Sequence, residues 1–394
     1  MAHIVNVKNT GLRGVKVADT KISFIDGEKG ILIYRGYRIN QLAQESSFME
    51  VAYLLLNGSL PNREELQEFE AHVKEARELP GYAYDILKKV PQNAAPMDLL
   101  QSAVSMLAMS DPNLLDETRE ANIRMAIRLI AGIPALVAAW HRIREGREPV
   151  PPDKDLSHAE NFLYQLKGKR PDPEMARDLD TCLILHADHT FNASTFACRE
   201  VVSTQAHMYA GVSAGIGALS GSLHGGANAK VMKMLMDLES EADIAGWIED
   251  QLEGGGKIMG MGHAVYKTMD PRAKYLKDMA ARLGKKTGQE RWHLLSSQVE
   301  EFGIQAFRKR GKTDILPNVD FYSAPVYHIM GIPLDLMTPL FAISRVSGWC
   351  SHIIEEKFAE AQDKPSLYRP AAEYIGQYCG LSGCTYEPME SRGG

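Results

Sequence analysis

The chain has 394 residues, of which 45% are hydrophobic and 24% charged, a composition typical of a globular protein with a large core. Its net charge of −6 argues against a general nucleic-acid-binding protein, because such proteins usually present a basic face. No apolar run approaches the roughly 20 residues that cross a bilayer, and the N-terminus lacks the apolar core of a signal peptide, so we expect a cytoplasmic protein without membrane contact.

The first half of the chain alternates between turn signals and helical patterns. Turn dipeptides separate short β-branched and aromatic runs within 22–37, which predicts small hairpins. A helix expected within 117–146 should be kinked or broken at Pro134. The segment 146–173, rich in proline and charge, reads as a connection across the surface. Three further helices are expected in this half, within 47–58, 60–81 and 96–110.

The amino-acid composition changes in the second half of the chain. The segment 209–228 is dense in Gly, Ala and Ser, and a helix pattern follows it, so His224 is predicted in a loop just before a helix. The region 225–320 contains several glycine breaks and the basic stretch 308–312. This stretch could equally be a local basic patch or a solvated surface loop. This region could be a smaller unit between two halves of a helical domain. A strong helix after 320 places Arg345 beside its apolar stripe, and the whole chain is predicted to be mainly α.

Five cysteines are odd in number and mostly far apart, which fits reduced thiols better than a disulfide framework. Cys379 and Cys384 are close enough in sequence to pair or to bind a metal. Because no histidine partner lies near them, we expect neither. The other three are Cys182, Cys198 and Cys350.

The stretch HADH places His186, Asp188 and His189 together, and it is similar to pieces of zinc sites in hydrolases. A zinc site needs three or four ligands, usually in a recognisable motif, and the chain offers no convincing one. The competing interpretation is that one histidine is a satisfied core residue while the other faces a cleft. We therefore expect no metal.

Three further polar positions could carry chemistry. His224 before a helix would feel the positive end of the helix dipole, which keeps the ring neutral as a hydrogen-bond donor, although it could equally be a capping residue. Glycines around His263 bare the backbone for a phosphate-bearing or carboxylate ligand, and Lys267 and Arg272 add positive charge. Asp320 has apolar neighbours that would raise its pKa towards that of a general base, but a turn aspartate would look similar.

Taken together, two histidines, one aspartate and several arginines indicate a specific class of chemistry. Arginines recognise a dianionic substrate in a bidentate manner. The histidines can polarise two carbonyl groups, and the aspartate can remove a carbon-bound proton. This set suits enolisation and carbon–carbon bond formation without a metal or an organic cofactor.

Five motifs in order give the chain a clear resemblance to the citrate synthase family: HADHTFNASTF, SLHGGAN, GMGHAVYKTMDPRA, PNVDFYSAP and LYRPAAEY. The match runs from about residue 36 to about residue 375. One departure is Met261, where family members more often carry an aromatic residue. This position lies in the loop that a ligand would approach, so the departure concerns local packing.

The resemblance implies an almost all-helical homodimer, with a large domain over 1–224 and 321–394 and a small mobile domain over 225–320 that closes on the substrates. His224 would then hydrogen-bond the thioester carbonyl of acetyl-CoA, and Asp320 would remove a methyl proton. His263 would polarise the ketone of oxaloacetate, which the enol attacks. Hydrolysis would release citrate and CoA, and no permanently bound cofactor is expected.

The resemblance also assigns binding residues. Arg272 and Arg345 match arginines that hold the oxaloacetate carboxylates, and His189 matches a histidine of the same pocket. Arg369 matches an arginine that reaches into the partner subunit's site. The backbone of 258–264 would lie along CoA, and Lys267, Arg310 and Lys312 are expected near its phosphates. The remaining CoA-binding residues expected there are Ile258, Met259, Gly260, Met261, Gly262 and Ala264.

Three alternative functions remain at this point. The first is a 2-methylcitrate synthase that uses propionyl-CoA, although GHAVYK leans towards citrate synthase, whereas GHPVY is common among methylcitrate enzymes. The second is a metal-dependent hydrolase built on the HADH stretch. The third is a catalytically silent CoA- or metabolite-binding regulator, which the complete set of His224, His263 and Asp320 argues against.

Overall fold

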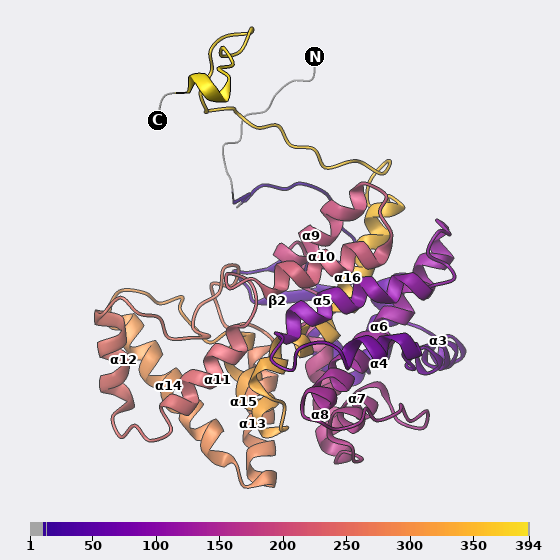
Figure 1. Ribbon diagram of the computed structural model, residues 1–394. Coiled ribbons are helices and arrows are strands. Elements are labelled where there is room, and N and C mark those ends of the chain that lie inside the picture. Colours follow the sequence, from indigo (N-terminus) through magenta and orange to yellow (C-terminus); the bar gives the residue numbers. More distant parts are fainter. Residues whose placement is uncertain (1–10, 13, 393–394) are drawn as a thin grey trace.

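A computed structural model describes residues 11–12 and 14–392. Its described part is mainly α, as predicted, with sixteen α-helices and one small sheet (Figure 1). The larger group, whose labelled members lie on the right in Figure 1, comprises α1 Ile39–Glu45, α2 Phe48–Asn57, α3 Arg63–Glu75, α4 Gly81–Leu87, α5 Pro96–Leu107, α6 Arg119–Arg144, α7 His158–Lys167, α8 Pro173–His186, α9 Ala193–Ser203, α10 Met208–Ser220 and α16 Met337–Lys357. The other five lie to its left: α11 Ala227–Asp237, α12 Ile244–Glu253, α13 Ala273–Thr287, α14 Glu290–Lys309 and α15 Val319–Ile329.

The predicted hairpins are confirmed as a three-stranded antiparallel sheet near the N-terminus. Strand β1 (Ser23–Asp26) pairs with β2 (Ile31–Tyr34), and β2 pairs with β3 (Tyr37–Arg38). Alternating residues of β2 are buried, as expected for a strand with one face against the core. Helix α1 packs against this sheet and against α8, which holds the sheet beside the helices that frame the cavity described below.

Helix α6 corrects two expectations from the sequence. The helix continues through Pro134, so the prediction that it breaks there was wrong. The proline and its neighbours are buried among packed helices. An 18-residue window of α6 has a mean hydropathy of 1.6, so the helix is long and apolar enough to cross a membrane, contrary to expectation. However, 83% of that window is buried inside the protein, which is typical of a core helix.

The segment 146–173 is not only a surface connection, because it contains helix α7. Ser157 accepts a hydrogen bond from the Glu160 amide while the Glu160 carboxylate accepts one from the Ser157 amide, which is a complete capping box. The helix buries Phe162, Leu163 and Leu166 against α6 and α8. The prolines and charges that suggested a loop lie mainly on either side of it.

The two groups of helices pack mostly among themselves. Helix α16 contacts α2, α6, α8, α9 and α10 and forms the centre of the larger group. Helix α15 contacts α11, α13 and α14 in the smaller group. The cavity that brings the predicted residues together is lined from both groups.

The cysteine prediction is wrong for two residues. Cys379 and Cys384, five positions apart with Cα atoms 4.9 Å from one another, form a disulfide in the C-terminal tail. The tight local turn Gly380–Gly383 brings the two cysteines together, so no histidine or distant partner is needed. The other three cysteines are buried and free, as expected.

Candidate active site

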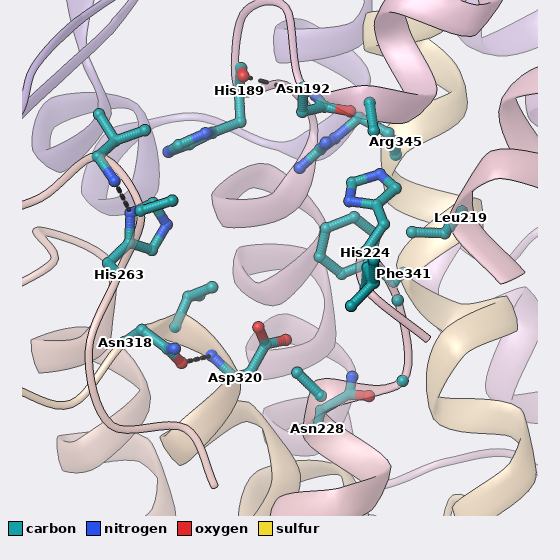
Figure 2. A pocket seen from close by; sticks show the side chains of 18 of the residues that line it. His189, Asn192, Leu219, His224, Asn228, His263, Asn318, Asp320, Phe341 and Arg345 are labelled. Atoms are coloured by element: carbon teal, nitrogen blue, oxygen red, sulfur yellow. Dashed lines mark hydrogen bonds between the residues drawn. The ribbon is translucent and has the colours of Figure 1, made fainter. Parts of the chain in front are cut away.

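A cavity of about 470 Å³ lies where the two groups of helices meet. It is lined by all three predicted catalytic residues and by three of the four predicted substrate-binding residues, some of which are drawn in Figure 2. They come from the loop after α8, the loop before α11, the loop before α13, the start of α15 and the middle of α16. These six residues are His189, His224, His263, Arg272, Asp320 and Arg345.

Asp320 is held at the first turn of α15. The N-cap Asn318 accepts hydrogen bonds from the amides of Asp320 and Phe321 at 3.0 and 3.3 Å, which fixes the start of the helix (Figure 2). Burial raises the pKa of Asp320 from 3.8 to about 6; Arg272 opposes the rise and Asp270 reinforces it. A carboxylate with this pKa is ionised at neutral pH and is a stronger base than an exposed aspartate.

His263 presents a defined tautomer to the cavity. Its Nδ1 accepts hydrogen bonds from the backbone amides of Val265 and Tyr266 at 3.0 and 3.2 Å. The proton of the neutral ring therefore sits on Nε2, where it can be donated. Burial lowers the pKa of His263 to about 4, and the positive charge of Arg272 adds to this effect. His263 is thus a neutral hydrogen-bond donor.

Gly260, three positions before His263, is required by close packing as well as by its backbone conformation. Gly260 has a φ of +77°, and a Cβ there would lie 2.9 Å from the Cα of Phe321 at the start of α15. Its carbonyl accepts a hydrogen bond from the Asn318 amide at 2.9 Å. The glycine therefore lets the His263 loop lie directly against the helix that carries Asp320.

His224 is also neutral and lies across the cavity from His263 (Figure 2). Its Nε2 accepts a hydrogen bond from the Ser194 amide at 3.3 Å and lies 2.9 Å from the Ser194 hydroxyl oxygen. The accepting Nε2 leaves the ring proton on Nδ1. Burial lowers the pKa of His224 to about 4, and Arg345 lowers it further. Ser194 was not predicted as a site residue, and its only signal in the sequence is its place in the motif HADHTFNASTF.

The two arginines of the cavity are both 2% exposed. Arg272 binds Asp270 through Nε at 2.9 Å and Nη2 at 2.8 Å, and although burial alone would lower its pKa, Asp270 raises it. Arg345 donates from Nε to the His186 carbonyl at 2.7 Å, and burial lowers its pKa to about 10. Both remain cations at neutral pH, so the cavity suits a substrate with more than one carboxylate. Asp270 is a second site residue that was not predicted from the sequence.

The two histidines of the HADH stretch have different environments, one in the core and one at the cavity, as one of the two interpretations predicted. His186 is fully buried and its Nδ1 contacts the Cys182 carbonyl at 2.8 Å. His189 lines the cavity, with its ring centroid 5.4 Å from that of His263; burial, then Arg272, holds its pKa well below the ordinary value. Asp188 points to His352. Among the described residues, no group of three or more His, Cys, Asp or Glu is arranged to hold a metal ion.

The residues expected to bind CoA are only partly gathered at the cavity. Gly262 and Ala264 line it, whereas the other predicted CoA-binding residues do not. Lys267 pairs with Asp314 at 3.5 Å, and Arg310 pairs with Glu249 at 2.5 Å. Lys312 is exposed, and Arg369 is exposed in the tail outside the cavity.

A glycine in α16 gives a direct test of how tightly the site loop is packed. A Cβ on Gly348 would overlap the Ala187 carbonyl and lie 2.6 Å from an Asp188 carboxylate oxygen. We expect Gly348→Ala to lower the free energy of unfolding by about 1–3 kcal/mol, as overpacked cores do. Gly303→Ala in α14 is the matched control, since its Cβ would meet only the Met261 Cε at 3.4 Å. It should be neutral or stabilise by about 0.5–1 kcal/mol; equal denaturation midpoints for the two variants would contradict the packing.

Comparisons with known proteins agree with this geometry. Residues 11–371 match the family model described as "Citrate synthase, C-terminal domain". A citrate synthase from Synechocystis is 43% identical over 384 residues, covering 97% of this chain and 93% of that one. A protein of Bacillus subtilis described as a citrate/2-methylcitrate synthase is 37% identical, covering 93% of this chain and 96% of its own.

Solved structures have the same fold. The citrate synthase of Pyrobaculum aerophilum superposes with a TM-score of 0.89 at 39% identity, covering 97% of this chain and 95% of that one. The citrate synthase of Thermoplasma acidophilum, solved with carboxymethyl coenzyme A and oxaloacetate, gives a TM-score of 0.87 at 33% identity, covering 97% and 99%. With the family model spanning most of its length, the chain belongs to the citrate synthase family.

Proposed function

We propose that this chain condenses acetyl-CoA with oxaloacetate in the cavity described above, with Asp320, His224 and His263 as the catalytic residues. The observation that carries the proposal is that the Asp320 carboxylate, whose pKa desolvation raises to about 6, faces the same cavity as two neutral histidines and two buried arginines. The Thermoplasma relative was solved with ligands of the same two chemical kinds.

The first step is removal of a proton from the acetyl methyl group. Asp320 accepts this proton, and the negative charge that develops on the thioester oxygen needs a donor. His224 supplies it through Nδ1–H, because its Nε2 is occupied by the Ser194 amide. A neutral imidazole N–H held in a site shielded from water stabilises a developing oxyanion by hydrogen bonding, while its proton stays on the nitrogen.

The second step joins the two substrates. The enol carbon attacks the ketone carbon of oxaloacetate, and the ketone oxygen takes the proton from Nε2–H of His263 to become the hydroxyl of the citryl thioester. The methyl proton held by Asp320 replaces the one that His263 gave up when the site returns to its starting state. Arg272, Arg345 and His189 hold the carboxylates of oxaloacetate so that the ketone faces the enol. Water then cleaves the citryl thioester, which gives citrate and free CoA.

Exclusion of water before the last step requires closure, and we assign this to a small domain. The predicted small domain spans 225–320 and the large domain spans 1–224 and 321–394. Helix α15 crosses the second boundary, and its contacts with α11, α13 and α14 support assigning its whole length to the small domain. Asp320 and His263 would then move with the small domain, whereas Arg345 would stay with the large one.

CoA would enter along the backbone of 258–264, of which Gly262 and Ala264 already line the cavity. Lys267, Arg310 and Lys312 stay our choices for its phosphates. The first two now pair with single carboxylates, so a phosphate would have to replace Asp314 and Glu249 as their partners. We also propose a homodimer in which Arg369 completes the partner's cavity.

The acyl group is decided by one experiment. We expect kcat/KM to be about tenfold or more higher for acetyl-CoA than for propionyl-CoA, because one methylene in an apolar pocket discriminates by roughly that much. Release of the CoA thiol with oxaloacetate present measures both values. The Bacillus relative named for both activities keeps the second candidate, 2-methylcitrate formation, open. A preference for propionyl-CoA would establish 2-methylcitrate formation. If the CoA thiol is released from neither acetyl-CoA nor propionyl-CoA, both candidate functions are contradicted.

A further inference from the structure

A chain of buried polar side chains, three of them ionisable as Asp, Arg or Glu and one a histidine, leads from the cavity to the C-terminal tail. Asp188, next to His189 of the cavity, faces His352 Nε2 at 3.3 Å. His352 Nδ1 lies 3.2 Å from Arg199 Nη1, which in turn binds Glu355 at 2.7 Å. All four side chains are 0% exposed. Charged hydrogen bonds shielded from water in this way are stronger than those at the surface.

The far end of this chain holds Tyr368. Arg199 Nη2 pairs with Glu356 at 2.6 Å, and the Tyr368 hydroxyl donates to the same Glu356 oxygen at 2.7 Å. The Tyr368 amide donates to the Ser203 hydroxyl at 3.2 Å, and its ring stacks on Phe196 with centroids 5.9 Å apart. Tyr368 is therefore attached to α9 and α16 through its backbone, its ring and its hydroxyl.

This attachment lies where the chain leaves the helical body. Beyond Tyr368 the described tail is almost entirely exposed and extends away from the helices (Figure 1). Arg369 is the first residue after the attachment, and it is not one of the residues that line its own chain's cavity. The direction in which Arg369 leaves the body is thus set by the residue before it.

We propose that Tyr368 is a positioning residue that directs Arg369 into the cavity of a second copy of this chain. The inference rests on the proposed role of Arg369 and extends it. The Glu356 carboxylate, fixed by Arg199, sets where the Tyr368 hydroxyl can lie. Arg199 also lies over the ring of Phe191, two positions after His189, at 4.5 Å, so the segment that leaves for the partner rests on residues that support the chain's own site.

The first test removes only the hydroxyl. Tyr368→Phe should raise KM for oxaloacetate about tenfold, the size expected for loss of one charged hydrogen bond, while kcat and the melting temperature change little. Tyr374→Phe is the matched control, because Tyr374 lies on the same tail and its hydroxyl donates to the nearby Gln377 carbonyl rather than to a helix of the body. It should leave KM unchanged. A fall in melting temperature and kcat without a change in KM would overturn the proposal, because that pattern indicates a merely structural role.

The second test uses mixed dimers of differently tagged chains. In the first mixed dimer, one chain carries His263→Ala and the other carries Arg369→Ala. The site of the second chain has an intact His263 and receives an intact Arg369 from the first chain. Activity should therefore reappear, and its absence would refute the proposed role of Arg369 itself. In a His263→Ala and Tyr368→Phe dimer, the working site receives Arg369 from a chain with Tyr368 intact. KM should return to the wild-type value. If KM stays raised while the first dimer is active, Tyr368 acts on its own site and the positioning inference fails.

Discussion

Asp320→Asn should lower kcat by about 10³-fold or more, within the range that general-base catalysis contributes, while the protein stays folded. The amide cannot accept the methyl proton, yet it has the same shape and fits the same first turn of α15. Asp243→Asn is the matched control: Asp243 caps α12 by accepting a hydrogen bond from the Gly246 amide, and asparagine caps equally well. Thiol release and circular dichroism would measure the two variants; turnover within about threefold of wild type for Asp320→Asn would contradict the assignment.

The same substitution should increase stability. The pKa of Asp320 is raised in the folded protein from 3.8 to about 6, so its ionised form disfavours folding above about pH 6. This penalty disappears below pH 3.8, where the carboxyl is protonated in both states. Removing it should stabilise the variant at pH 8 by up to about 3 kcal/mol, and the gain should shrink as the pH falls to 4. Equal stability of variant and wild type at pH 8 would show that the carboxylate is not destabilised.

His263→Ala should lower kcat by about 10²- to 10³-fold, the usual effect of losing one donor to a developing oxyanion. The loss arises because Nε2–H is the donor that the Val265 and Tyr266 amides orient towards the cavity. KM for acetyl-CoA should change far less than kcat, since the ketone belongs to the other substrate. The exposed His72 of α3 provides the control, His72→Ala. A fall in kcat that is shared by both variants would remove His263 from the mechanism.

Local patterns in the sequence predicted much of the fold. Glycine and polar turn residues between β-branched runs indicated the hairpins, and apolar spacing indicated the long helix that carries Arg345. Local patterns misjudged α7, where a capping box lay within a segment that proline and charge made resemble a loop. They also misjudged Pro134, because burial in a packed helix outweighs the loss of one backbone hydrogen bond.

Part of the candidate site could be predicted from the sequence and part could not. Its reactive side chains could be identified, because histidine in a glycine-rich loop and aspartate before aromatic residues have recognisable chemistry. Their supporting partners could not, because they come from distant parts of the chain. Ser194 meets His224 across 30 positions, and His352 meets Asp188 across 164. Asp270 is only two positions from Arg272, yet nothing in the sequence distinguishes it from a turn aspartate.

The most direct measurement follows the acetyl methyl hydrogens in D2O. Acetyl-CoA is incubated with the enzyme and malate, which has a hydroxyl in place of the ketone and so cannot be condensed, and deuterium in the methyl group is followed by NMR. We expect exchange with the wild-type enzyme and its near-complete loss in Asp320→Asn. Exchange at equal rates in both would contradict the claim that Asp320 removes the proton.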